Sequence, residues 1–137
     1  MNIMINEKLT PQARRMKKII KDAFLDLLET KSLDKITKNA ICEKADIGHT
    51  TFYRYFMDKY HVASEITMDI TSEYLQIVER ALPKNYELYL NETFAFLSSN
   101  VELLRLLYQN SMNYYSLSNE ILNNLHEHYK KNNQTKT

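Results

Sequence analysis

The chain has 137 residues, of which 44% are hydrophobic, 11% aromatic and 26% charged, with a formal net charge of +1. This length fits one domain, or a small domain with a helical extension, and the hydrophobic content is sufficient for a buried core, which excludes a largely disordered chain. One glycine and two prolines leave few turn signals, so the composition favours an all-α fold over one rich in strands.

The charge is unevenly distributed along the chain. Residues 1–59 carry 12 Lys and Arg against 8 Asp and Glu, a balance of +4, whereas residues 60–137 carry 6 against 9, a balance of −3. This division indicates that the front half alone faces a polyanion. The single cysteine, Cys42, excludes an internal disulfide framework, and no apolar run reaches membrane-spanning length, so we expect a cytoplasmic protein with no membrane partner.

The first predicted helix spans residues 11–30. Its apolar residues recur at three- and four-residue steps, which is the period of one helix face, and Thr10 is placed to cap it. Its first turns carry a basic cluster that includes Arg14 and Arg15. Such a cluster is ordinarily a solvated helix face, but ahead of a nucleic-acid-binding motif it is a candidate for phosphate contact.

Two short helices follow. KNAICEKA, at residues 38–45, has Thr37 as its N-cap, and residues 46–48 lead into a further helix at about 48–55. Two short helices joined by a three-residue turn with a glycine in or near it are typical of a helix-turn-helix. The second helix of such a pair lies in the DNA major groove, where its first turn reaches the base edges.

The only glycine, Gly48, falls where this second helix begins. A position without Cβ suits a close approach to DNA, and a glycine N-cap leaves backbone N–H groups exposed at the positive helix end. His49, Thr50 and Thr51 open the helix with side chains that can reach bases or phosphates. The alternative for His49 is a solvated surface position.

The aromatic residues that follow divide between the two sides of the helix. Phe52 and Phe56 are expected to face inward, whereas Tyr53 and Tyr55 present hydroxyl groups to the DNA backbone. The alternative for the two tyrosines is a half-buried packing role. Lys59, at the start of the next helix, is a candidate for a further phosphate contact.

This region resembles the DNA-binding domain of TetR-type transcriptional regulators, whose usual pattern is A-G-V-S-x-G-T-L-Y-x-H-F-x-x-K-x-x-L. The resemblance covers residues 13 to about 62, and the chain matches the pattern or substitutes conservatively at Ala45, Ile47, Thr51, Phe52, Tyr53, Phe56, Lys59 and Val62. It departs at four positions, where Asp46 replaces glycine, Gly48 serine, Thr50 glycine and Tyr55 the frequent histidine. The expected DNA-binding residues are therefore Thr37, Gly48, His49, Thr50, Thr51, Tyr53, Tyr55, Lys59, Arg14 and Arg15.

The back half predicts further helices. A long fourth helix begins after Asp58 and is stopped by Pro83, and others are expected at about 85–98, 101–112 and 117–130. The expected organisation is a three-helix DNA-binding domain at 8–57, a short helical regulatory or dimerisation domain at 58–130 and a disordered tail at 131–137.

The resemblance implies a homodimer that reads a palindromic operator, usually as a repressor, with a small-molecule effector bound in the back half. The residues Tyr74, Phe94 and Tyr108 are candidates for an effector pocket, although a plain helical core explains them as well. We expect the dimer interface at 101–112 and 117–130. These segments contain the leucine-rich group Leu103, Leu104, Leu106 and Leu107 and the second stripe Leu117, Ile121, Leu122 and Leu125.

Two other classes of function compete with this interpretation. The first is a TetR-like interaction protein or coactivator that acts through a protein or effector partner with weakened DNA contacts, for which His49, Thr50 and the short back half argue. The second, an enzyme, is disfavoured because no nucleophile–base pattern or paired-carboxylate motif occurs. No cofactor and no metal site are expected, since His126 and His128 lie two apart on a helix and point in different directions.

Overall fold

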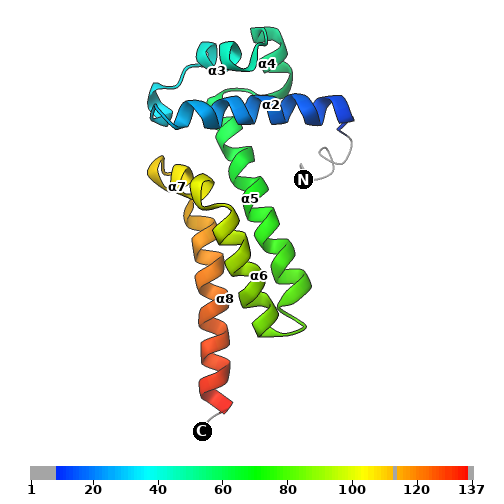
Figure 1. The fold of residues 1–137 in the computed structure, drawn as a ribbon, viewed down its shortest axis with the longest axis vertical. Helices are drawn as coiled ribbons and strands as arrows, with labels where there is room; N and C mark the ends of the chain where they lie inside the picture. Colours follow the sequence, from blue (N-terminus) through cyan, green and yellow to red (C-terminus); the bar gives the residue numbers. More distant parts are fainter. Residues whose placement is uncertain (1–8, 113, 136–137) are drawn as a thin grey trace. The chain divides into compact units, whose positions relative to one another are not determined.

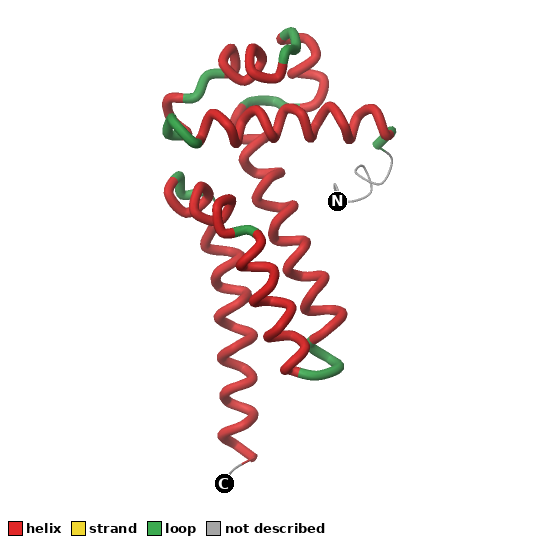
Figure 2. Tube along the Cα trace, viewed as in Figure 1, coloured by secondary structure: helices red, strands yellow, loops and turns green. Residues whose placement is uncertain are grey.

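The computed structural model describes residues 9–112 and 114–135, and over these residues the chain is helical with no strand (Figure 1). Short connections join successive helices (Figure 2). The elements are α2 (Pro11–Leu28), the 3-10 turn η1 (Leu33–Lys35), α3 (Lys38–Ala45), α4 (His49–Tyr55), α5 (Lys59–Ala81), α6 (Tyr86–Ser99), α7 (Val101–Gln109) and α8 (Tyr114–Thr135). None of the helices in these residues is long and apolar enough to cross a membrane.

Capping residues set several of the helix boundaries. The Thr10 hydroxyl accepts a hydrogen bond from the Ala13 N–H at 3.1 Å, and the Thr37 hydroxyl accepts one from the Ala40 N–H at the same distance. These bonds satisfy N–H groups that have no partner inside their helix, which is why α2 and α3 begin where the sequence predicts.

Other boundaries differ from the expectation. The helix expected at 101–112 ends at Gln109, because Ser111 adopts a left-handed conformation with φ of 53° and the Asn110 side chain bonds to the Leu106 carbonyl at 2.9 Å. The last helix, α8, extends through Thr135, so it includes most of the tail expected to be disordered at 131–137. Residues 136–137 lie outside the described part of the chain.

The chain divides into two compact units, one up to Ile66 and one from Thr67 onward. The start of α5 belongs to the first unit and its remainder to the second, whereas the sequence placed a domain boundary between residues 57 and 58. The boundary between the two units thus falls inside α5, after Ile66. The two units are described separately.

In the first unit, α3 and α4 both contact α2 (Figure 1). The inward face of α2 buries Ile20, Ala23, Phe24 and Leu28, at the helical spacing that the sequence predicts. The other elements contribute large buried side chains to this unit, namely Ile36, Ile41, Phe52, Phe56 and Val62. Burial of each such side chain contributes about 1.5–3 kcal/mol, so this apolar core is what holds the short helices α3 and α4 in place.

In the second unit, a hydrogen-bonded group links three helices. The hydroxyl groups of Tyr74 on α5 and Tyr89 on α6 lie 2.6 Å apart, and the Asn124 side chain on α8 donates to the Tyr74 oxygen at 2.8 Å. Both tyrosines are fully buried, and burial raises the pKa of Tyr74. Because buried polar groups are costly without partners, this network fixes how the three helices pack.

Three leucines that the sequence assigned to a dimer interface lie inside this second unit. Leu106, Leu107 and Leu117 are buried by the chain's own packing. The expectation for these three side chains is therefore wrong. Leu122 and Leu125, which belonged to the same prediction, are exposed on α8.

Candidate functional site

The candidate site is built around the connection between α3 and α4. At the end of α3, Asp46 is left-handed, with φ of 56° and ψ of 52°, and its N–H bonds to the Cys42 and Glu43 carbonyls. The Ile47 N–H also bonds to the Cys42 carbonyl, at 3.0 Å. This pattern ends a helix and turns the chain sharply, and Asp is one of the few residues besides glycine that tolerate it. The turn lets α4 begin three residues after α3 ends.

The side chains of α4 are divided between an inner and an outer side. Phe52 and, directly after the helix, Phe56 are fully buried, with ring centroids 6.1 Å apart. Thr51 and Tyr55 are half-buried. The outer side exposes His49, Thr50, Tyr53 and Arg54. The structure therefore brings together on one exposed surface three of the side chains that the sequence proposed for DNA contact, His49, Thr50 and Tyr53, and adds Arg54 beside them.

Gly48 precedes α4 as its N-cap, in an extended conformation with φ of −83°. This conformation is open to any L-residue, and a Cβ added to Gly48 would meet no atom within 4 Å. The fold within the described residues therefore does not require glycine at this position. The close approach of a partner is a candidate explanation for glycine at position 48.

Lys38 is a site residue that the sequence analysis missed. It is the first residue of α3, and its ammonium group donates a hydrogen bond to the hydroxyl of Tyr53 on α4. The ammonium nitrogen also lies 4.4 Å from the centre of the Tyr53 ring. The only signal in the sequence is a lysine directly after the N-cap of α3, and this signal alone does not reveal a contact made across 15 residues.

Lys59 has a different use from the phosphate contact that the sequence suggested. Its ammonium group donates to three backbone carbonyls, those of Leu33 at 2.8 Å, Asp34 at 3.1 Å and Ile36 at 2.8 Å. An ammonium group has three N–H donors, so all of them are used. We therefore assign Lys59 to holding the α2–α3 connection against the start of α5, in place of a contact with DNA.

The basic residues of α2 differ in their accessibility. Arg14 and Arg15 are both exposed, and the Arg14 guanidinium bonds to the Leu9 carbonyl at 2.7 Å. Lys17, two residues further along, is instead half-buried and paired with Glu65 at 3.0 Å. The exposure of Arg14 and Arg15 leaves their contact with a phosphate a prediction.

Glu65 on α5 is the centre of an ion-pair cluster. Besides Lys17, its carboxylate lies 3.4 Å from the Lys21 ammonium and 3.1 Å from Nε2 of His61. Burial opposes ionisation of this carboxyl group, but the hydrogen bond and charge of Lys17, with the charges of Lys21 and His61, outweigh it and lower the pKa of Glu65. Nδ1 of His61 accepts a hydrogen bond from the Met57 N–H at 2.9 Å, so the cluster also holds the segment that follows α4.

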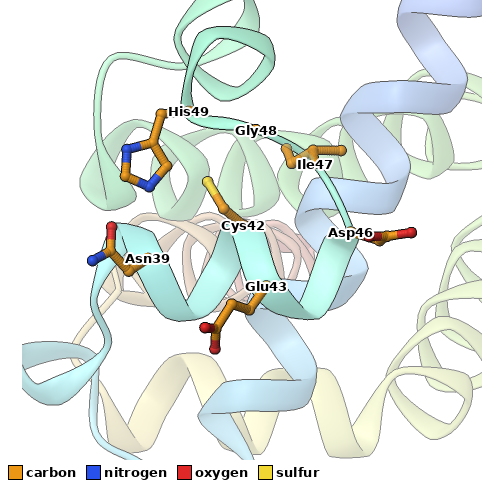
Figure 3. Close-up of a pocket in the computed structure, with 7 residues that line it drawn as sticks. All are labelled: Asn39, Cys42, Glu43, Asp46, Ile47, Gly48 and His49. Carbon is orange, nitrogen blue, oxygen red and sulfur yellow. The ribbon is translucent and has the colours of Figure 1, made fainter.

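An open hollow of about 620 Å³ lies beside the α3–α4 connection. Figure 3 shows the Cys42 sulfur directed toward the segment that carries Gly48 and His49, with the Glu43 carboxylate pointing away from it. Burial raises the pKa of the Cys42 thiol, which disfavours a reactive thiolate. In the described residues, no three His, Cys, Asp or Glu side chains are grouped so as to hold a metal ion.

The proposed effector-pocket residues differ in their burial. Tyr74 is fully buried against Tyr89 and Phe96, whereas Phe94 is 73% exposed and Tyr108 is 63% exposed. None of the three lines the hollow beside α4 or a smaller one of about 300 Å³ next to Tyr86 and His128. The effector pocket at these residues stays a prediction.

No family model, no curated protein and no solved structure matches this chain.

Proposed function

We propose that this chain is a DNA-binding transcriptional regulator, with α3 and α4 as a helix-turn-helix and α4 as its recognition helix. The observation that carries the proposal is the division of α4, where Phe52 is buried and His49, Thr50 and Tyr53 face outward. A recognition helix needs both features, since it must be held by the core and still offer polar side chains to the major groove. The resemblance of residues 13–62 to TetR-type regulators supports the same assignment.

The charges of the first unit also support a polyanionic partner. Arg14, Arg15 and Arg54 are exposed, and the front half of the chain carries an excess of positive charge. Lysines and arginines that neutralise phosphates release counterions, which makes DNA affinity dependent on salt. We therefore expect the logarithm of the association constant to fall linearly with the logarithm of the salt concentration, by a slope of about 0.9 for each phosphate neutralised.

A homodimer is part of this proposal, because one short recognition helix makes few contacts with its site. The exposed apolar residues of α8, Leu122, Leu125 and Tyr129, support it, since they recur at three- and four-residue steps on one helix face. We call these three residues the α8 stripe. A two-fold dimer would read half-sites about 34–36 Å apart, or a multiple of that distance.

The proposal is tested by selecting sequences from a random pool of duplex DNA with the purified chain. We expect enrichment of a roughly palindromic sequence, which also gives the operator. On that operator, Tyr53→Phe should weaken binding to all variants alike, whereas His49→Ala and Thr50→Ala should change which sequence is preferred, because phosphate contacts position the protein and base contacts specify the sequence. Absence of enrichment, together with binding that does not change with salt, would contradict the proposal.

A second candidate is an interaction protein that acts through a protein partner. The observation in its favour is the exposure of Phe94, Tyr108 and Tyr129 in the second unit. Large exposed apolar side chains often mark protein–protein contacts. The same selection experiment separates the two candidates, because an interaction protein of this kind would enrich no DNA sequence.

A further inference from the structure

The contact between Lys38 and Tyr53 joins the first residue of α3 to the outer side of α4. The Lys38 ammonium donates to the Tyr53 hydroxyl and lies beside its ring, while 54% of Tyr53 remains exposed to solvent. Lys38 itself is half-buried. The two side chains therefore form one fixed polar group at the surface that carries the recognition residues.

The hydrogen-bonding capacity of this pair is only partly used. When the Tyr53 oxygen accepts from Lys38, the phenol still has its own O–H to donate, and the ammonium group has two further N–H donors. Over the described residues, no acceptor is found for these remaining donors. A pair of adjacent unused donors that carries a positive charge matches a ligand that only accepts hydrogen bonds and is negatively charged.

Acidic side chains do not compensate this charge. Lys38 takes part in no ion pair within the described residues, whereas Lys17, Lys18 and Lys21 of α2 are each paired with a carboxylate. The acidic residues of α3 and its turn, Glu43 and Asp46, lie at the opposite end of that helix. The Lys38 charge is thus left for an external partner.

We propose that Lys38 and Tyr53 act together as a clamp for one phosphate of the DNA backbone. This inference rests on the proposed function, and it adds a residue that the sequence did not single out. The ammonium group neutralises the phosphate and donates to one of its oxygens, while the Tyr53 hydroxyl donates to the same phosphate. Because the two residues come from α3 and α4, the clamp fixes the orientation of both helices on the duplex and carries no sequence information.

The test uses a mixed-sequence 30-base-pair duplex as the probe and measures affinity over a series of salt concentrations. We expect Lys38→Gln to weaken binding about tenfold at low salt and to reduce the salt slope by about 0.9, as for the loss of one phosphate contact. Lys38→Arg should keep the slope. Tyr53→Phe should weaken binding several-fold without changing the slope, since the hydroxyl group is neutral.

Lys44→Gln is the matched control, because Lys44 is an exposed lysine near the other end of the same helix. We expect it to have less effect on the slope than Lys38→Gln. The double variant Lys38→Gln with Tyr53→Phe should lose less affinity than the two single effects multiplied, because both residues serve one contact. Circular dichroism spectra of all variants establish that they are folded.

The outcomes separate this inference from the proposed function. If the unaltered chain binds the duplex in a salt-dependent way but Lys38→Gln has the same slope as the unaltered chain, the clamp is wrong and the proposed function stands. A loss of affinity in Lys38→Gln with no change of slope would also overturn the clamp, since Lys38 would then only hold the Tyr53 ring. If the unaltered chain does not bind duplex DNA at all, the proposed function fails and the clamp fails with it.

Discussion

The two units of the chain treat their large apolar side chains differently. All three phenylalanines of the first unit, Phe24, Phe52 and Phe56, are fully buried. The exposed large apolar residues of the first unit are Ile19, Tyr53, Met57 and Tyr60. In the second unit Phe96 is buried, but Phe94, the α8 stripe and several other large apolar residues are exposed. On the proposed function, the first unit would meet a charged and hydrated partner, DNA, and the second unit another protein surface. We therefore propose that the two units recognise different kinds of partner.

The largest expected effect tests whether the first unit depends on its buried aromatic core. Phe52→Ala should lower the free energy of unfolding by about 3–5 kcal/mol, because it removes a large side chain and leaves a cavity. Its neighbour Tyr53 is the control, since Tyr53→Ala changes an exposed residue and removes its contact with Lys38, and should alter stability by about 1 kcal/mol or less while weakening DNA binding. Thermal unfolding followed by circular dichroism measures both effects. Equal losses of stability would contradict the division of α4 into two sides.

The next prediction concerns the second unit and compares two leucines assigned to the same interface from the sequence. Leu107→Ala should lower the free energy of unfolding by about 2–5 kcal/mol, because Leu107 is buried in the chain's own core. Leu122→Glu should leave stability of the monomer within about 0.5 kcal/mol but weaken the dimer at least about tenfold. Analytical ultracentrifugation over a range of concentrations measures the dimer. A Leu122→Glu variant that associates as strongly as the unaltered chain would remove the α8 stripe from the interface.

A smaller effect is expected from the ion-pair cluster of Glu65. Because the pKa of Glu65 is lowered in the folded chain, its contribution to stability is present above the ordinary pKa of a glutamate, about 4.3, and is lost as the pH falls through the lower, folded value. Glu65→Gln should therefore lower the free energy of unfolding by about 1–2 kcal/mol at pH 7 and flatten the loss of stability as the pH falls below about 4.3.

Asp22→Asn is the control for this prediction. Asp22 pairs with Lys18 at 2.8 Å, but both side chains are largely exposed, so the pair should contribute at most about 1 kcal/mol. The measurement is the midpoint of urea unfolding as a function of pH. If the unfolding midpoint of Glu65→Gln falls as steeply at acid pH as that of the unaltered chain, other groups cause the loss of stability in acid.

The local features of the fold could be predicted from the sequence because they depend on nearby residues. The caps of α2 and α3, the turn at residues 46–48 and the burial of Phe52 and Phe56 all follow from helical spacing and from side chains a few residues away. Helical periodicity alone does not show which of two adjacent apolar residues is buried. Ile19 and Ile20 both fit the apolar spacing of α2, but Ile19 is 45% exposed, whereas Ile20 is fully buried.

Features that depend on distant segments could not be predicted in this way. The sequence shows that α7 is apolar on several faces, but the packing of the unit decides that Leu106 and Leu107 are the buried ones. The same holds for Lys59, whose three acceptors lie 23 to 26 residues earlier in the chain. From the sequence alone, a lysine at the start of α5 is predicted to be a surface charge, because the position of the α2–α3 connection is not known.

Because the space around Gly48 is empty, the effect of a side chain at position 48 on folding can be separated from its effect on binding. Since an added Cβ would meet nothing within 4 Å and the backbone angle suits any L-residue, selection for folding alone has little to act on at this position. In a library that carries all twenty residues at position 48, most variants should survive a screen for a folded chain. If DNA passes close by, as the proposed function requires, a screen for DNA binding should retain only glycine and the smallest side chains. Residues at position 48 that pass the folding screen but fail the binding screen would show that the partner, and not the fold, restricts this position.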